Sequence, residues 1–371
     1  MNEAAGGRAK KYNNIKLAGG IAKSILTFIL LFHFVNAGWS GYLNFTIAGF
    51  IPNVYLRLVI FTLFTGAVLA VIFFPANYYL EFHLEHKYSL SNQTFLKWIW
   101  EEVKESLVGS AIGIPILLLF FYVLRSFGEL WWLPFAVLLF LISVLLAKIA
   151  PVIILPLFYK ITPLDKPELK ERVMFLASQA GMKVENVYLF NMSKNTKKAN
   201  AAFTGLGSTK RILLGDTLVN NFSNDEIETV IAHELGHYKR KHIIKNIFIG
   251  AFFSFLTFFL AAKLYDFSLR YFGYQFRYDI GALPVLLLWG MIIGTVQTPL
   301  SNWISRKFEY EADEYAVRGS GKKESFVSAL SKLTEQNLAD REPNPFVEWF
   351  FYSHPSISRR VRFINSIPSA E

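Results

Sequence analysis

Two histidines and a glutamate carry the strongest chemical signal in the sequence. His233, Glu234 and His237 lie in HELGH, within the stretch IAHELGHYKRKH. On a helix, residues four apart project from one face, so both imidazoles can bind one metal ion while the glutamate lies beside the first ligand. Zinc is the usual ion for this spacing, and such a glutamate can take a proton from a metal-bound water. The spacing therefore predicts a water-activating zinc site.

The residues around this motif predict the helix that would present it. SNDEIETVIAHELGHYKRKH, residues 223–242, begins with a serine suited to the N-cap and has acidic residues in its first turn, where the helix dipole favours them. The alternative is a polar helix face that carries two ordinary histidines. The apolar run IETVIA directly before the motif favours the metal interpretation.

A catalytic zinc site of this kind needs a third protein ligand and an open position for water. SRKFEYEADEYAVRGSG, residues 305–321, predicts a helix that ends at glycine, and its Glu309 and Asp313 are four residues apart on one face. Glu309 can ligate zinc, and Asp313 can hold a ligand histidine through its second ring nitrogen. Glu311 points elsewhere. Spacing alone fits an acidic, solvated helix face equally well.

The composition places these residues in a membrane protein. Of 371 residues, 53% are hydrophobic and only 18% are charged, whereas soluble domains carry about 25% charged residues. The absence of cysteine excludes disulfides, thiolate ligands and cysteine nucleophiles. The formal net charge is +10, but the basic residues flank apolar stretches and no nucleic-acid-binding motif is present, so we predict no nucleic acid partner.

Six stretches are long and apolar enough to cross a lipid bilayer, which takes about 20 residues per helix. They are residues 17–35, 56–79, 107–124, 132–159, 243–262 and 282–303. Pro151 and Pro156 should bend or end the fourth span. The basic residues among the first 16 predict a cytoplasmic N-terminus, and six spans return the C-terminus to that side. The loop 263–281 should then lie outside, although it carries Lys263, Arg270 and Arg277.

The polar segment between the fourth and fifth spans predicts an aqueous α+β domain. KPELKERVMFLASQAGM has apolar residues at helical spacing, VENVYLFNM and RILLGDTLV predict short strands, and KKANAAFTGLGSTK predicts a strand edge and a turn. We therefore divide the chain into a membrane region with four spans (1–159), a catalytic domain with the HELGH helix (160–242), two further spans (243–303) and a C-terminal part of the catalytic domain (304–371).

Five motifs together resemble those of the type I CAAX prenyl proteases, integral-membrane zinc metalloproteases of the gluzincin class. In chain order they are APVIILPLFYKITPL, NAAFTGLGSTKRILLGDTL, HELGH, RKFEYEADEYA and SHPSISRRVRFI. The resemblance extends from about the second span to the C-terminus. It implies a mainly α, multi-span helical membrane protein, barrel-like around a wet cavity, with a zincin-type α+β catalytic domain on the cytoplasmic side. Eukaryotic members have seven helices, whereas this chain shows six spans.

The resemblance also implies a role for each residue of the metal site. His233, His237 and Glu309 would bind one zinc ion per chain. Glu234 would be the general base for a zinc-bound water that attacks the scissile peptide bond. Asp313 matches the aspartate that supports a ligand from behind.

Three further residues have roles by resemblance alone. His354 and Arg360 match a pair that steadies the substrate or the transition-state oxygen, and Asn200 matches an asparagine on the strand edge that pairs with the substrate backbone. KKANAAF lacks the histidine and serine before this asparagine and the aromatic residue after it that many members have. This departure concerns substrate pairing and leaves the zinc chemistry unaffected.

The predicted function is a zinc-dependent membrane endopeptidase acting on a peptide or protein, resembling enzymes that remove the C-terminal a-a-X tripeptide of prenylated CAAX peptides. One alternative is a stress-type quality-control metalloprotease, although such relatives have about four spans. Another is a transporter with an incidental motif, whose intramembrane Lys148 and Gln297 would line a pathway. The chain is expected to be an integral multi-pass protein in the lipid bilayer, in the plasma or inner membrane of a bacterium or in the endoplasmic reticulum of a eukaryote.

Overall fold

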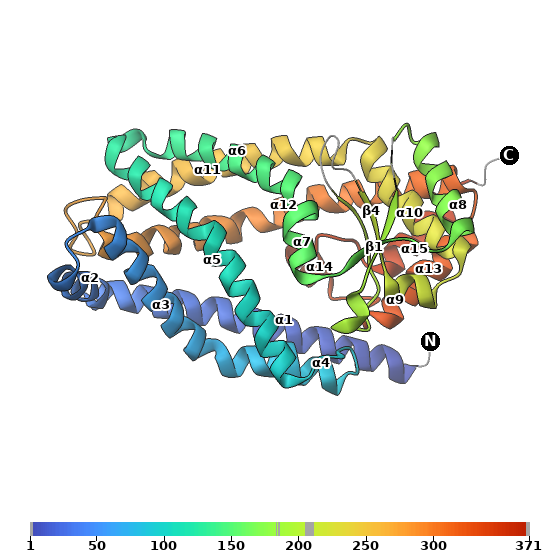
Figure 1. Ribbon diagram of the computed structural model, residues 1–371, viewed down its shortest axis with the longest axis horizontal. Helices are drawn as coiled ribbons and strands as arrows, with labels where there is room; N and C mark the ends of the chain where they lie inside the picture. The colour runs from blue at the N-terminus through green and yellow to red at the C-terminus, as the bar shows by residue number, and fades with distance from the viewer. Residues whose placement is uncertain (1–2, 183, 185, 205–210, 369–371) are drawn as a thin grey trace.

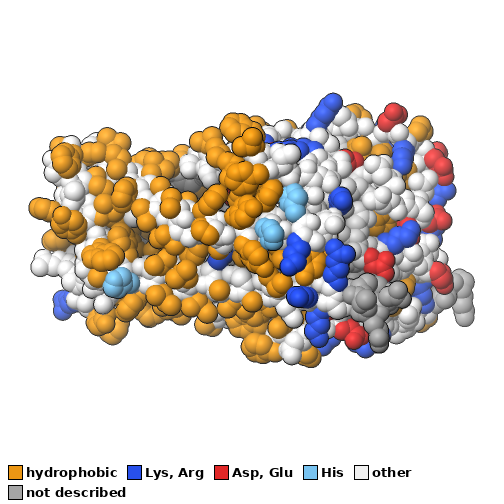
Figure 2. All heavy atoms as spheres, turned by 90° about the horizontal axis from the view of Figure 1, so that it is seen from below, with side chains coloured by type: hydrophobic (Ala, Val, Ile, Leu, Met, Phe, Trp, Pro, Cys, Tyr) orange, Lys and Arg blue, Asp and Glu red, His pale blue; other side chains and the backbone are white. Residues whose placement is uncertain are grey.

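Long apolar helices form one end of the molecule, and a small sheet with shorter helices forms the other (Figure 1). The computed structural model describes residues 3–182, 184, 186–204 and 211–368. The turn predicted within KKANAAFTGLGSTK falls at 205–210, outside the described residues. Large hydrophobic side chains cover the long-helix end, while charged side chains gather around the sheet (Figure 2). This separation is what a bilayer and water require of the two ends.

Six helices of the described chain are long and apolar enough to span a membrane, which confirms the predicted number. Their exposed hydrophobic side chains include Val71, Phe252 and Val296. The helices that form these spans are α1 (Glu3–Asn36), α3 (Val54–Asn77), α5 (Phe95–Ser126), α6 (Trp132–Ile149), α11 (His242–Ser268) and α12 (Leu283–Ser320).

Short elements extend or connect these spans. Pro151 lies in a π-helical turn after α6, and Pro156 lies in α7, so the fourth span changes its winding where the prolines were expected to bend or end it. The connecting elements are α2 (Trp39–Phe50), η1 (Tyr78–His83), α4 (Leu84–Lys87), η2 (Gly128–Leu130), η3 (Ala150–Ile154), α7 (Leu155–Phe158) and η6 (Ile280–Ala282).

The aqueous end contains a four-stranded sheet in the order β1-β2-β4-β3. Strand β2 (Val187–Phe190) is parallel to β4 (Arg211–Gly215), while β1 (Ile161–Pro163) and β3 (Ala201–Thr204) are antiparallel to their neighbours. Strands β2 and β4 match the two predicted strands, whereas β1 was not predicted. Strand β3 forms one edge of this sheet.

Shorter helices pack around the sheet and enclose the largest core, in which Leu169, Ile212 and Ile227 are buried. Helix α8 matches the helix predicted from KPELKERVMFLASQAGM. These elements are α8 (Pro167–Gln179), η4 (Met192–Lys194), α9 (Asp216–Asn221), α10 (Asn224–Lys239), α13 (Lys323–Gln336), α14 (Pro345–Phe351) and α15 (Ile357–Ser366).

Close packing of α10 against α12 brings the two predicted ligand helices together. Ser223 caps α10 and forms a reciprocal capping box with Glu226. In the middle of HELGH, a Cβ atom on Gly236 would lie 2.9 Å from the Cα of Ala312, so only glycine permits this approach. Helix α12 runs without a break from its membrane-spanning part to the capping residue Gly321. The helix face that carries Glu309 and Asp313 is therefore a direct continuation of the sixth span.

Candidate metal centre

Three side chains from α10 and α12 converge on one point. His237 Nε2 lies 3.2 Å from His233 Nε2 and 3.3 Å from Glu309 Oε1, and His233 Nε2 lies 3.4 Å from Glu309 Oε2. Two of the residues are one helical turn apart on α10. The third, Glu309, comes from α12, which can approach α10 closely at Gly236. This is the ligand set predicted from the sequence, brought within reach of a single ion.

The cluster has the chemistry that a divalent cation requires. Ligand atoms about 2.1 Å from an ion in tetrahedral directions are about 3.4 Å apart, close to the observed separations. Glu309 Oε2 is buried and has no hydrogen-bond partner among the described residues. Burial alone would lower the pKa of His233, but its contacts with Asp313 and Glu309 raise the pKa to about 9. The surroundings thus favour positive charge at this position, and the residues fit a zinc ion.

A carboxylate directly supports the first ligand histidine. His233 Nδ1 lies 2.9 Å from Asp313 Oδ1, so this nitrogen carries the proton and leaves Nε2 free for the metal. Arg360 holds the same carboxylate with two nitrogens, Nε at 2.9 Å from Oδ2 and Nη2 at 2.6 Å from Oδ1. Asp313 is completely buried, where an unpaired charge would be costly, and Arg360 neutralises this charge.

The second ligand histidine is supported through another ring. His237 Nδ1 lies 2.9 Å from His242 Nδ1, and His242 Nε2 lies 3.0 Å from Glu311 Oε2. If His237 binds the metal through Nε2, its Nδ1 donates to His242, whose Nε2 then donates to Glu311. His242 is 1% exposed and stacks on Phe308 with ring centroids 4.2 Å apart. Sequence reasoning gave no role to His242 or Glu311.

The glutamate of HELGH is the one acidic residue of the site without a fixed partner. Glu234 is half-buried, and no hydrogen bond or ion pair joins it to another residue of the described segments. It follows His233 directly in the chain. Burial alone would lower the pKa of Arg360, but Asp313 and Glu309 raise it, and the charge of Glu234 adds a smaller contribution in the same direction. Its carboxylate is therefore free to exchange a proton.

His354 reaches the metal cluster from the segment between α14 and α15. Its Nε2 lies 3.4 Å from Glu309 Oε1, and the side chain is 64% exposed. The segment is held by Arg306, whose Nη1 donates to the carbonyls of Glu348, Trp349 and Tyr352. Arg306 satisfies carbonyl groups at the end of α14 and thereby fixes the start of the segment that carries His354. Arg306 was not predicted to contribute.

Asn200 lies at the sheet edge immediately before β3. Its backbone oxygen accepts a hydrogen bond of 2.9 Å from the Gly215 amide, so this group is used within the sheet. Its side chain is exposed. Phe203 on the same strand contacts Tyr238 of α10 at a centroid distance of 5.6 Å, which places β3 beside the metal-ligand helix.

Comparisons with known proteins agree with this architecture along the whole chain. Residues 163–367 match peptidase family M48, and residues 1–160 match the family described as "CAAX prenyl protease N-terminal, five membrane helices". The chain is 35% identical to CAAX prenyl protease 1 of Saccharomyces cerevisiae over 313 residues, covering 79% of this chain and 68% of that protein.

Two further similarities cover nearly the entire chain. It is 30% identical over 358 residues to the uncharacterized metalloprotease YhfN of Bacillus subtilis, covering 95% of this chain and 84% of that protein. The crystal structure of Ste24p from S. mikatae has a TM-score of 0.86 at 29% identity, covering 98% of this chain and 90% of that chain.

Proposed function

The chain belongs to peptidase family M48 and is a membrane metalloprotease, and from this premise we propose that it hydrolyses peptide bonds at the site formed by His233, His237, Glu309 and Glu234. The convergence of the three ligand atoms beside an unpartnered carboxylate is the observation that carries the proposal. Family membership argues against the transporter alternative. The six spans argue against the shorter stress-type proteases.

His233, His237 and Glu309 would hold one zinc ion per chain. When bound, zinc supplies a Lewis acid that polarises a carbonyl group and lowers the pKa of water. The two histidines bind as neutral rings, and their outer nitrogens are oriented by Asp313 and His242. Glu309 contributes the negative charge, since both histidine ligands are neutral in that state.

Glu234 moves the proton. Its carboxylate takes a proton from the attacking water and returns it to the nitrogen of the leaving peptide, as a general base and then a general acid. The absence of a fixed partner among the described residues supports this role, because the carboxylate can then contact the attacking water.

His354 and Arg360 contribute differently to the same site. His354 is exposed beside Glu309, so it can donate a hydrogen bond to the oxygen that becomes negative in the transition state. Arg360 is buried and binds Asp313 with two nitrogens, while its Nη1 lies 3.8 Å from Glu309 Oε2. We infer that Arg360 acts mainly by fixing Asp313 and through it His233.

The substrate is a peptide or protein, and the finer assignment is a prenylated C-terminal CAAX peptide. Similarity to CAAX prenyl protease 1 of yeast supports this assignment. The exposed Asn200 side chain at the edge of β3 would contact the backbone of the bound peptide. A second candidate is the cleavage of unprenylated membrane peptides, which the similarity to a bacterial metalloprotease over 95% of this chain keeps open.

The catalytic domain would face the cytoplasm. Basic residues before the first span and around the sheet support this orientation. The basic loop 263–281 weighs less against it because Arg277 pairs with Asp266 at 3.5 Å and lies 4.0 Å from Glu129. The enclosing membrane would be the endoplasmic reticulum in a eukaryote or the plasma or inner membrane in a bacterium. We also propose that the chain divides after residues 159, 242 and 303, as described above.

Glu234→Gln tests the proposal. The purified variant should keep its zinc, because Glu234 is not a ligand, yet lose cleavage of a farnesylated Cys-a-a-X peptide by at least about 100-fold. Metal analysis and product mass spectrometry are both needed. Loss of zinc to the extent expected of His233→Ala would contradict the assigned roles. If the wild type cleaved the unprenylated peptide at the same rate as the farnesylated one, the second candidate substrate would be favoured.

A further inference from the structure

The outer edge of β3 is open along only part of its length. Because Gly215 N donates to Asn200 O and Ala202 pairs with Leu213, the even-numbered residues of this strand direct their backbone groups towards β4. The odd-numbered residues therefore direct theirs to the outer edge. No strand of the described chain pairs with that edge. Ala201 and Phe203 thus each offer an unpaired backbone N–H and C=O, here called a rung, to an additional strand.

Side chains already fill the rungs that precede these two. The Asn337 amide oxygen accepts from Ala199 N at 2.8 Å, and its nitrogen donates to Ala199 O at 3.1 Å. One side chain thus makes both bonds that a neighbouring strand residue would make. One rung earlier, Lys197 N donates to Leu90 O at 2.8 Å and Lys197 O accepts from Gln336 at 2.7 Å.

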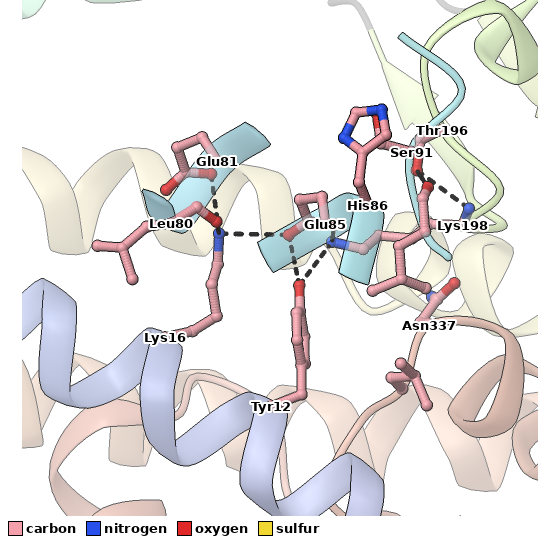
Figure 3. Close-up of polar contacts among 12 residues, drawn as sticks. Tyr12, Lys16, Leu80, Glu81, Glu85, His86, Ser91, Thr196, Lys198 and Asn337 are labelled. Atoms are coloured by element: carbon pink, nitrogen blue, oxygen red, sulfur yellow. Dashed lines mark hydrogen bonds and ion pairs between the residues drawn. The ribbon is translucent and has the colours of Figure 1, made fainter. Parts of the chain in front are cut away.

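Membrane helices anchor this part of the chain. Lys198 Nζ lies 2.9 Å from Glu85 Oε2 and 3.1 Å from the Tyr12 hydroxyl, which in turn donates to Glu85 at 2.5 Å (Figure 3). Asn13 donates to Leu338 O at 2.6 Å, directly after Asn337. Glu85 and Tyr12 are buried, so these bonds are shielded from water. Helices α1 and α4 therefore hold the segment just before β3 and the residue that follows Asn337.

We propose that Asn337 is a register stop for the substrate: it occupies the Ala199 rung, so a bound peptide can pair only from Ala201 onward. This inference rests on the proposed peptidase function. A peptide added to the edge has a period of two residues, so a single free rung would shift it by two positions relative to the zinc ligands. Asn337 would therefore determine which peptide bond lies at the metal. It is a positioning residue that does not touch the reacting atoms.

Mapping of cleavage positions tests the stop. Wild type should cut an unprenylated peptide and its farnesylated form at defined bonds. Asn337→Ala opens the Ala199 rung, so at least about a tenth of its products should be displaced by two residues, most clearly without the lipid to hold the register. Gln336→Ala is the matched control, because it frees only the Lys197 carbonyl, while Leu90 O still accepts from Lys197 N and Asn337 still closes the edge. Its products should match those of wild type.

Amide exchange gives a readout that does not depend on catalysis. With hydrogen–deuterium exchange resolved to single residues, Ala199 N–H should be protected in wild type without peptide and exposed in Asn337→Ala. When peptide binds to proteins that also carry Glu234→Gln, Ala201 and Phe203 should gain protection in both. Ala199 should regain it only in Asn337→Ala.

Several outcomes would overturn the proposal. These are unchanged product masses in Asn337→Ala with kcat/KM within about 2-fold of wild type, a uniform loss of rate without displaced products, or an Ala199 amide that stays protected. If the alanine variant does not purify, Asn337→Asp keeps the acceptor for Ala199 N–H and loses the donor to its carbonyl, and a smaller displaced fraction is expected. A wild type without chelator-sensitive cleavage would instead refute the peptidase function, while the exchange of Ala199 without peptide would still show whether Asn337 fills the rung.

Discussion

The two ligand histidines of one helix are held in different ways. His233 contacts the buried carboxylate of Asp313, which Arg360 neutralises, so its support comes from α12 and α15. His237 contacts a second imidazole, His242, which is the first residue of a membrane-spanning helix. Both arrangements leave Nε2 free for the metal. They differ in what fixes the outer partner.

This difference shows that the two ligand histidines depend on different helices. The support of His233 depends on α12 and α15, whereas the support of His237 depends on where α11 begins. Lys241 adopts a left-handed conformation with φ of 58°, and this turn separates α10 from α11. The candidate membrane-spanning helix α11 thus begins at the residue that orients a ligand. Changes on the two sides should therefore be separable.

Removing Glu309 should have the largest effect on zinc affinity, because Glu309 is a ligand itself and lies against both His233 and His237. If the roughly 10–16 kcal/mol of a four-ligand zinc site is divided among its ligands, one ligand contributes about 3 kcal/mol. Glu309→Ala should therefore bind zinc on the order of 100- to 1,000-fold more weakly and be inactive. Competition with a chelator of known affinity measures this. A zinc-replete Glu309→Ala protein would show that the third ligand lies elsewhere.

Asp313→Asn should have the next largest effect. The amide keeps the size of the side chain but removes the negative charge between His233 and Arg360, which leaves Arg360 buried without its main partner. Loss of an outer partner typically weakens metal binding about 10- to 100-fold, and we expect the upper end of that range. The same chelator competition should show zinc retained at high metal concentration. Zinc affinity within about 2-fold of wild type would contradict the role of Asp313.

The relay on the other side should give a smaller loss. His242→Phe can keep the stacking on Phe308 but removes both hydrogen bonds, so zinc affinity should fall by about 10-fold. Glu311→Gln keeps an oxygen that accepts a hydrogen bond from His242, so zinc affinity should fall by less in this variant than in His242→Phe. Glu314→Gln is the control, because this half-buried acid on the same helix pairs with Arg318 and has no contact with the metal cluster among the described residues. If His242→Phe weakened zinc as much as Asp313→Asn, the two supports would be equivalent.

Sequence reasoning found the elements that depend on local pattern. Six apolar spans, the HELGH helix with Ser223 at its cap, and strands β2 and β4 follow from periodicity and composition. The need for a third ligand made Glu309 a candidate, but its spacing fitted a solvated acidic face equally well, and only the resemblance to the prenyl proteases selected it as a ligand. Gly236, which permits the two helices to meet, lies inside the motif itself.

The features that sequence reasoning missed depend on long-range placement. On a continuous helix, His242 would lie about 140° around the axis from His237, so only the turn at Lys241 brings the rings together. Glu311 gains its role because α11 starts opposite it. Asn337 bonds the backbone of Ala199, which lies 138 positions earlier in the chain and just before β3, and no local pattern encodes that contact.

A change at the first turn of α10 should separate stability from metal orientation and give the smallest effect on zinc. Burial alone would raise the pKa of Glu226, but its contacts with Lys332, Ser328 and the Ser223 amide lower that pKa overall. A carboxylate with a lowered folded pKa contributes stability above its unfolded pKa, near 4.3, and loses it as pH falls through the folded value.

Glu226→Gln should therefore reduce the free energy of unfolding by about 1–2 kcal/mol at pH 7, and its difference from wild type should shrink between about pH 5 and pH 3. Thermal denaturation in detergent across this range measures the difference. The control is Glu324→Gln, at an exposed residue in the first turn of α13 with no ion pair to the described residues. Zinc affinity should stay within about 2-fold of wild type, since none of the three ligands contacts this turn. If Glu226→Gln weakened zinc as much as His242→Phe, ligand orientation would depend on the stability of α10 as a whole, and the contrast between the two histidines would lose its basis.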